Sequence, residues 1–272
     1  MDRTAGLREH RCCLLTGPFD FTRAPVLETR QKWLICHAST VLCFIMDRRR
    51  QAALNNAEWC AAVWRTHDLQ VEQVDGAWFT RSATPSLYPN VVTIAPEPEL
   101  ALLIDLATSA SNHGAQFAVK DSFDVLPLQD FGFAKLFDAQ WLWIAPSAPS
   151  DDSDPACRRI TDATGFATWI DAWQLRGGGA SGILLPELLN DQRVEVWGKF
   201  DCDEQLIGGL IAYRSLETVG ITNVFGSPNR ILASLASIDA KPIVCWQHGS
   251  GHLSAEEGDF RPIGPLTVWT LT

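Results

Sequence analysis

The hydrophobic period of the sequence changes twice between residues 194 and 247, and this change limits the folds that the chain can adopt. Three short segments rich in Val, Ile, Phe and Tyr come first, at Val194–Phe200, Leu206–Arg214 and Val219–Phe225. Asp, Glu and Ser residues separate them, which is typical of a β-meander. A helical pattern follows, and then Ile243–Gln247 is strand-like again. A strand, a crossover helix and a strand predict a parallel pair with a right-handed crossover.

The helical segment has a clear beginning and one apolar face. Ser227 and Pro228 suit an N-cap and a first-turn proline. Apolar residues then follow at helical spacing, namely Ile231, Leu232, Leu235 and Ile238. This segment therefore predicts the crossover helix.

This order of elements resembles the second half of a GNAT-superfamily acyltransferase domain. The resemblance depends on the meander that ends at Phe225, the crossover helix, and the strand at Pro242–Gln247. The segment Ala255–Trp269 follows, where the family often has a helix, a Gly-Phe pair and a final strand. The match covers about half of the chain and is a pattern rather than one diagnostic motif.

The first half of the chain repeats the same order of elements. A helix at Gln51–Arg65 precedes a hairpin that turns at Asp75-Gly76. A strand, a helix, a strand and a Trp-rich last strand follow, at Asn90–Ala95, Glu99–Ser111, Ala115–Lys120 and Ala139–Ile144. We interpret this as a divergent internal duplication, with two GNAT-like units in tandem. The predicted fold class is α+β, each unit having a mixed sheet, one strand–helix–strand crossover and flanking helices.

Composition places the boundaries between these units. Residues 46–145 form the predicted N-terminal unit, residues 146–155 (PSAPSDDSDP) a solvated linker, and residues 156–272 the C-terminal unit. Residues 1–45 hold four of the eight Cys and have no clear periodicity. We expect them to be an extension, poorly ordered or not native, with Met46 as the true start.

Charge and cysteine content exclude several classes of protein. The net charge of −10 makes nonspecific binding to nucleic acid or to an anionic membrane unfavourable. Trp33–Met46 is apolar but too short to span a bilayer. The eight Cys follow no regular spacing, so we expect a reducing cytoplasm rather than a disulfide framework. The eleven Trp are expected to fill cores.

The resemblance implies where acetyl-CoA, the acyl donor of the family, would bind. In this family the strands corresponding to Val219–Phe225 and Ile243–Gln247 splay apart and pair with the pantetheine arm. The pyrophosphate lies on free amides at the start of the crossover helix, where the helix dipole favours an anion. The residues implied for cofactor binding are therefore Asn223, Val224, Phe225, Gly226, Asn229 and Arg230.

Both halves depart from the family's Arg/Gln-x-x-Gly-x-Gly/Ala phosphate loop. In the second half only Gly226 and Arg230 suit a phosphate, and Pro228 removes one amide donor. In the first half the turn reads Pro96-Glu97-Pro98-Glu99, whose carboxylates would repel a pyrophosphate. We expect the first unit to be a structural partner that does not bind CoA. For the second unit, altered CoA binding and a lost site both remain open.

Catalysis in this family is direct attack of an amine on the thioester, with a donor for the leaving thiolate that is often a Tyr. No Tyr follows the last core strand, where the sequence reads His248-Gly249-Ser250-Gly251-His252. His248 is the candidate replacement because imidazole titrates near neutral pH; the alternative is a solvated loop histidine. No general base is identified, and Glu195 and Glu217 are interpreted as solvated carboxylates.

Two other motifs favour structural explanations. Residues 177–182 fit G-x-G-x-x-G but follow a helix, whereas a dinucleotide fingerprint must follow a strand, so we predict a flexible loop. Cys245, His248 and His252 have a spacing that zinc could use but no fourth ligand. We predict that Cys245 is a small core residue and that no metal is bound.

Two functions from different classes remain. The first is an acetyl-CoA-dependent N-acyltransferase that acts on a small-molecule or peptide amine. The second is a catalytically inactive GNAT-like protein whose cleft binds another ligand or a protein. The turn from Gly226 to Ala233 distinguishes the two functions, because only the acyltransferase requires this turn to bind CoA.

Overall fold

The computed structural model describes residues 47–112, 116–146, 154–238, 240–249 and 260–271. These residues belong to one compact unit, Phe44–Thr272. The predictions for residues 1–45 and for most of the linker lie outside the described residues. Within those residues, no helix has the length and apolar composition needed to cross a membrane.

The first half, up to residue 146, begins with a helix over residues 47–66, which we call helix 47–66. The elements that follow are β1 (Glu72–Val74), β2 (Ala77–Phe79), β3 (Val91–Thr93), α2 (Leu100–Asn112), β4 (Phe117–Asp121), the 3-10 helix η1 (Leu128–Phe131) and β5 (Ala134–Ile144). The predicted helices and strands are therefore present. The turn at Asp75-Gly76 joins β1 to β2, and Gly76 has the positive φ of 82° that such turns require.

The second half begins with an unpredicted edge strand and ends with a long strand. Its elements are β6 (Cys157–Ile160), α3 (Ala163–Gln174), the 3-10 helix η2 (Pro186–Asn190), β7 (Val194–Phe200), β8 (Leu206–Arg214), β9 (Val219–Phe225), α4 (Asn229–Ile238), β10 (Ile243–His248) and β11 (Arg261–Leu271). The meander and the crossover helix lie where the periodicity predicts them. Each half has one parallel pair, β3 with β4 and β9 with β10.

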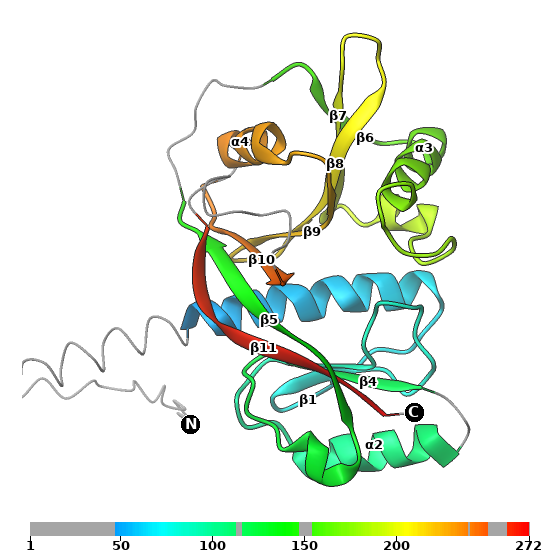
Figure 1. Cartoon of the computed structure of the whole chain (residues 1–272), viewed down its shortest axis with the longest axis vertical. Coiled ribbons are helices and arrows are strands. Elements are labelled where there is room, and N and C mark those ends of the chain that lie inside the picture. The colour runs from blue at the N-terminus through cyan, green and yellow to red at the C-terminus, as the bar shows by residue number, and fades with distance from the viewer. Residues whose placement is uncertain (1–46, 113–115, 147–153, 239, 250–259, 272) are drawn as a thin grey trace, which may run out of the picture. The chain divides into compact units, whose positions relative to one another are not determined.

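One continuous sheet contains the strands of both halves, in the order β1-β2-β3-β4-β11-β5-β10-β9-β8-β7-β6. The expectation that each half has its own sheet is therefore wrong. The cause is an exchange of last strands, since β5 pairs with β10 of the second half and β11 pairs with β4 of the first. The central pair β5–β11 joins the halves (Figure 1). The domain boundaries and the internal duplication stay predictions.

Helices cover both faces of this sheet. Helix 47–66 and α3 share one core, which is rich in tryptophan: Trp59, Trp64, Trp169 and Trp173. The helix α4 lies on the opposite face, where Ile231, Leu232 and Leu235 contact alternate residues of β8, β9 and β10. Ten of the eleven Trp are described, and eight of these are buried. Most of the tryptophans therefore lie in the cores, as predicted.

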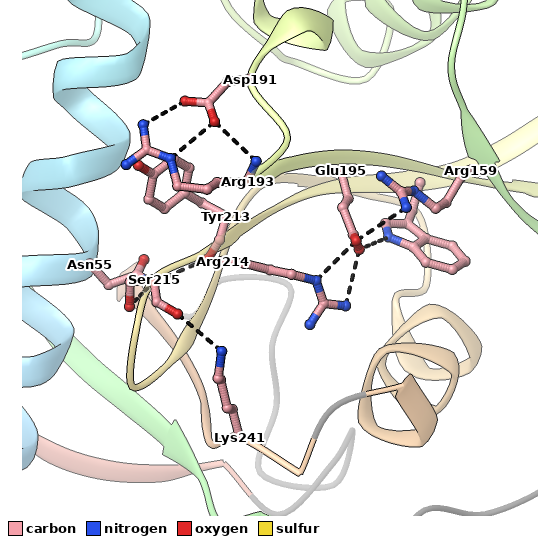
Figure 2. Close-up of polar contacts among 10 residues, drawn as sticks. Asn55, Arg159, Asp191, Arg193, Glu195, Tyr213, Arg214, Ser215 and Lys241 are labelled. Atoms are coloured by element: carbon pink, nitrogen blue, oxygen red, sulfur yellow. Dashed lines mark hydrogen bonds and ion pairs between the residues drawn. The ribbon is translucent and has the colours of Figure 1, made fainter.

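Asn55 fixes helix 47–66 against the second half. Its Nδ2 donates to the backbone oxygens of Tyr213 (3.1 Å) and Thr218 (3.3 Å) and to Ser215 Oγ (3.2 Å), as Figure 2 shows in part. The Asn55 side chain occupies the space above Gly220 of β9, where a Cβ would lie 1.8 Å from Asn55 Oδ1. Only glycine at position 220 allows this contact, so the two positions depend on each other.

Lys120 of β4 is a buried cation without a carboxylate partner among the described residues. The residue is 3% exposed, and its ammonium lies 4.1 Å from the ring centroid of Trp246 and 4.9 Å from that of Trp141. Burial lowers the pKa of Lys120 to about 7, and the nearby thiol of Cys60 opposes that change. Two indole rings thus replace the water that a lysine normally binds.

We expect Gly220→Ala to lower the free energy of unfolding by about 2 kcal/mol, because the new methyl group overlaps Asn55. Asn55→Ala should also destabilise, by about 1–3 kcal/mol, since it removes the hydrogen bonds to the backbone oxygens of Tyr213 and Thr218 and to Ser215 Oγ. The free energy of unfolding of the double variant should be only slightly lower than that of Asn55→Ala alone. Urea denaturation of the four proteins gives the coupling energy, and strictly additive effects would contradict the contact.

The free energy of unfolding should rise with pH above about 7 because of Lys120. Between its folded pKa of about 7 and its unfolded value of 10.5, the unfolded chain binds more protons, so raising the pH favours the folded state. Lys120→Met removes the contribution of Lys120 to the pH dependence of stability. Urea denaturation at pH 7 and pH 9 should show the wild type gaining about 2 kcal/mol relative to Lys120→Met. Parallel pH profiles of the two proteins would show that Lys120 does not titrate in this range.

Candidate functional site

The two parallel strands of the second half separate soon after they begin to pair. β9 and β10 are paired only at Val219 with Ile243 and at Gly220 with Val244. Their outer edges stay paired, β9 with β8 as far as Phe225 and β10 with β5 as far as His248. Because both outer edges are held while the inner pairing ends, a V-shaped opening forms between β9 and β10. We call it the V.

A β-bulge in β9 forms one wall of the V. Thr222 pairs with Ile211 and Phe225 with Gly209, so two residues of β9 lie opposite one residue of β8. The two bulged residues are Asn223 and Val224, opposite Leu210. Asn223 has a φ of 52°, a left-handed conformation that Asn tolerates better than most residues. The bulge therefore changes the direction of β9 where it leaves β10.

The turn from β9 into α4 has exposed backbone and a glycine that sterics require. Gly226 has a φ of 64°, and a Cβ there would lie 2.4 Å from the backbone oxygen of Ile207. The first intrahelical bond of α4 is Leu232 N–H to Pro228 O, at 2.9 Å. The amides of the first turn, at residues 229–231, therefore have no acceptor within the helix. Gly226, Asn229 and Arg230 are exposed and lie together at this turn.

Arg230 adds an exposed positive charge to the same turn. Its side chain is 63% exposed, and its Nε lies 4.0 Å from a carboxylate oxygen of Asp154. That contact is at the limit of an ion pair and is exposed to water, so it contributes little to stability. The guanidinium is therefore available to an anion that approaches the start of α4.

The other residues predicted for cofactor binding differ in exposure. Asn223 and Val224 are half-buried, whereas Phe225 is 3% exposed and lies edge-on to Trp169, with 5.2 Å between the ring centroids. The side chain of Phe225 is thus a core residue, and only its backbone faces the turn. A small cavity of about 10 Å³ at the base of the V has room for about one water molecule.

His248 lies at the end of β10, on the side of the V opposite the bulge. Its Nδ1 donates to the backbone oxygen of Asp138 at 2.8 Å, since a carbonyl can only accept. The imidazole also contacts the ring of Phe137, with 4.8 Å between the centroids. Nε2 is left as the proton acceptor of the neutral ring, and His248 is exposed.

The corresponding position in the first half is closed by a threonine. Thr93 Oγ1 accepts from the amide of Ser122 at 2.9 Å and donates to the backbone oxygen of Lys120 at 3.4 Å, so it joins β3 to β4 where their pairing ends. The carboxylates of Glu97 and Glu99 are exposed near the start of α2. This end of the first half therefore has neither an opening nor a site favourable to an anion.

Glu195 is not the solvated carboxylate that we predicted. It is 6% exposed. Its carboxylate accepts hydrogen bonds from Arg214 Nε (2.9 Å) and Trp197 Nε1 (3.1 Å), and Arg159 Nη1 lies 3.3 Å from its Oε1 (Figure 2). Burial alone would raise the pKa of Glu195, but the hydrogen bonds from Arg214 and Trp197 outweigh it and the net shift is downward. Glu195 is therefore an ionised partner in a structural network. Glu217 is exposed, as predicted.

The two competing motifs have structural explanations. The glycine-rich segment after α3 is an irregular loop that is packed only in part: a Cβ at Gly178 would lie 2.4 Å from the Trp173 ring, whereas Gly177 and Gly182 have open space around them. Cys245 lies in the α4-side core, which confirms that prediction, and burial raises its pKa. His252 lies outside the described residues. Among those residues, no three His, Cys, Asp or Glu side chains are arranged to hold a metal ion.

Sequence reasoning missed two aromatic residues of the first half near the base of the V. Trp59 of helix 47–66 lines the cavity there, and Tyr88 of the β2–β3 loop packs on Trp59, with 6.3 Å between the ring centroids. Both residues are buried. No local pattern indicates this, since the contacts depend on how helix 47–66 crosses the second half.

Comparison with known proteins supports the fold. No family model and no curated protein matches the sequence. A GCN5-related N-acetyltransferase from Kribbella flavida has a similar structure, with a TM-score of 0.55 and 10% identity over 80% of this chain and 95% of that chain.

Two further solved structures are less similar. A GNAT-family acetyltransferase from Novosphingobium aromaticivorans has a TM-score of 0.48 at 14% identity, over 78% of this chain and 94% of that chain. N-myristoyltransferase from Saccharomyces cerevisiae has a TM-score of 0.47 at 10% identity, over 66% of this chain and 57% of that chain. The mixed sheet, the crossover helix and the similarity to the Kribbella flavida protein show that the chain has the GNAT-superfamily fold.

Proposed function

We propose that the chain is an N-acyltransferase that takes its acyl group from acetyl-CoA or a related acyl-CoA and transfers it to an amine. The observation that carries this proposal is the V, which begins two residue pairs into the β9–β10 pairing and ends beside the exposed start of α4. An extended arm and a group of phosphates need these two features next to each other.

The pantetheine arm would lie in the V as an added strand. Beyond Gly220 and Val244, β9 and β10 no longer pair with each other, so their facing N–H and C=O groups are available to a ligand. The amides of pantetheine have the same donors and acceptors as a peptide, and binding by β-augmentation is favourable for such a ligand. The bulge at Asn223 and Val224 would then lie beside the thioester.

The pyrophosphate would lie at the turn into α4. Gly226 lets the backbone approach the phosphates closely, and the free amides at the start of the helix favour an anion. Arg230 supplies a guanidinium that can bind phosphate through two parallel hydrogen bonds. This chain would thus use one arginine and one helix terminus where the family uses a glycine-rich loop.

The reaction needs a group that moves protons. When the amine attacks the thioester carbonyl, a C–N bond forms, the C–S bond breaks, and the electron pair leaves with sulfur. The amine nitrogen must lose a proton and the sulfur must gain one. His248 suits this task because Asp138 O fixes its ring through Nδ1, which leaves Nε2 to accept the proton and pass it on. We propose His248 as the catalytic residue for this transfer.

The first half would contribute structure rather than a second CoA site. Thr93 closes its strand opening, and Glu97 and Glu99 disfavour phosphate. Among the described residues, the cysteines are free thiols (Cys60, Cys157, Cys202, Cys245). Free thiols accord with the reducing cytoplasm that we propose as the location.

Arg230→Glu should weaken the binding of CoA by about ten- to a hundredfold, because it replaces a phosphate partner with a repelling carboxylate. Titration calorimetry with CoA measures the dissociation constant. The melting temperature without ligand should change little, since Arg230 is exposed.

Arg81→Glu is the matched control, since Arg81 is an exposed arginine just after β2 that pairs with Glu72 of β1, far along the sheet from the V. It makes the same change in net charge and should leave CoA binding unchanged. Equal weakening by both variants would mean that net charge, rather than the turn into α4, governs binding. CoA that fails to bind the wild type would overturn the proposed function.

His248→Gln should lower kcat for acetyl transfer by about a hundredfold or more and leave CoA affinity unchanged, because glutamine cannot move a proton. Release of the CoA thiol from acetyl-CoA, with a panel of amines as acceptors, measures the rate. An unchanged kcat would mean that His248 is a solvated loop histidine and not the catalytic residue.

A further inference from the structure

The base of the V is closed, because Gly220 of β9 still pairs with Val244 of β10. An arm that enters beside the start of α4 and lies between the two strands runs towards this base. Hydrogen-bonded strands lie only about 4.8 Å apart, so the group at the end of the arm cannot pass between them. It must turn out of the sheet, either towards the α4 face or towards the face that helix 47–66 covers.

The two faces of the sheet differ at this point. On the α4 face, Ile221 and Cys245 pack with Ile231 and Leu235 in the core. On the opposite face, residues of helix 47–66 and of the strands line the cavity of about 10 Å³ at the base of the V. Among the described residues, the room for the end of the arm is therefore on the face that helix 47–66 covers.

Three tryptophans form the walls of this cavity: Trp59 of helix 47–66, Trp141 of β5 and Trp246 of β10. Trp59 is 3% exposed, and its ring centroid lies 6.0 Å from that of Tyr213 and 6.3 Å from that of Tyr88. An indole that packs on two other rings cannot move aside without opening a gap in the core, which is unfavourable. The walls therefore keep the cavity close to the size of one water molecule or one methyl group.

A buried hydroxyl in the same wall indicates a polar atom in the ligand. Tyr213 lines the cavity and is 1% exposed, and its hydroxyl has no hydrogen-bond partner among the described residues. An unpaired buried hydroxyl is unfavourable, and an acceptor atom from a ligand would offset this cost. The carbonyl oxygen of an acyl group is such an acceptor. A space of methyl size beside an unused donor suits an acetyl group.

We infer that this cavity receives the acyl group of the acyl-CoA, and that Trp59, which the first half contributes, is a specificity-determining residue that limits the group to acetyl. This inference rests on the proposed function. It goes further than that function, because an arm in the V and phosphates at the turn into α4 are compatible with an acyl chain of any length.

The size of the cavity determines how strong this selection is. Acetyl-CoA should bind about fourfold more tightly than CoA, because its methyl group is buried in the cavity. Each further methylene would overlap an indole, and overpacking of a rigid core is unfavourable. An apolar pocket discriminates by about ten- to two-hundredfold for one methylene. Butyryl-CoA should therefore bind at least about tenfold more weakly than acetyl-CoA.

The first test observes Trp59 directly. The full chain is labelled with 5-fluorotryptophan, which gives one fluorine signal for each of the eleven tryptophans. Trp59→Phe and Trp64→Phe assign two of these signals. Acetyl-CoA should shift the Trp59 signal, and free CoA, which has no acyl group, should shift it much less. Trp64 is the internal control, because it lies in the same helix and the same core but does not line the cavity.

The second test changes the size of the cavity. Titration calorimetry gives the dissociation constants of acetyl-CoA, butyryl-CoA and CoA for the wild type, Trp59→Leu and Trp64→Leu. Trp59→Leu should bind butyryl-CoA at least as tightly as acetyl-CoA, because leucine leaves space for the longer chain. Trp64→Leu, the matched control, makes the same change in the same core and should keep the wild-type preference for acetyl-CoA.

The possible outcomes separate this inference from the proposed function. Acyl-CoA that binds the wild type with no preference for acetyl, or that leaves the Trp59 signal in place, overturns the role of the cavity and leaves the acyltransferase proposal standing. An equal loss of preference in both leucine variants overturns the role of Trp59. If Trp59→Leu does not fold, the wild-type affinities and the Trp59 signal decide. A wild type that binds neither CoA nor acyl-CoA overturns the proposed function, and this inference with it.

Discussion

The antiparallel pairing of β5 with β11 is the interaction on which the rest of the structure depends. These are the longest strands of the sheet, and each is the last strand of its half. Because β11 pairs with β4 and β5 pairs with β10, neither half can complete its sheet without the other. Removing either strand would expose unpaired edges in the middle of the sheet. The two halves must therefore fold as one structure.

This exchange also gives the first half a place in the site of the second. With the halves joined through β5 and β11, helix 47–66 crosses the strands of the second half, and Asn55 fits into the space that Gly220 leaves. The same helix brings Trp59 to the base of the V, and Tyr88 of the β2–β3 loop packs on the ring of Trp59. A half whose own opening is closed by Thr93 thus supports the opening of its neighbour.

Local structure was predictable from the sequence, whereas contacts between distant segments were not. The meander, the crossover helix and the turn at Gly226 follow from period and turn chemistry, which act over a few residues. The partner of β5 does not, because a strand pattern specifies which side is buried but not which edge it joins. Glu195 was misjudged for the same reason: the groups that keep it ionised, Arg159 and Arg214, come from two other strands.

Backbone strain near the V is the last feature that the pairing of the strands accounts for. Five described residues other than glycine have a positive φ, and four are Asp, Asn or Glu: Asp68, Asp124, Glu204 and Asn223. Leu87 is the only apolar one, and it directly precedes Tyr88. Asn223 is the only one within a strand, and it lies in the bulge of β9. Strained residues persist only where surrounding structure or function maintains them. Asn223 adopts this conformation where β9 leaves β10, so the strain lies at the opening of the V, and the pairing of β9 with β8 on both sides of the bulge maintains it.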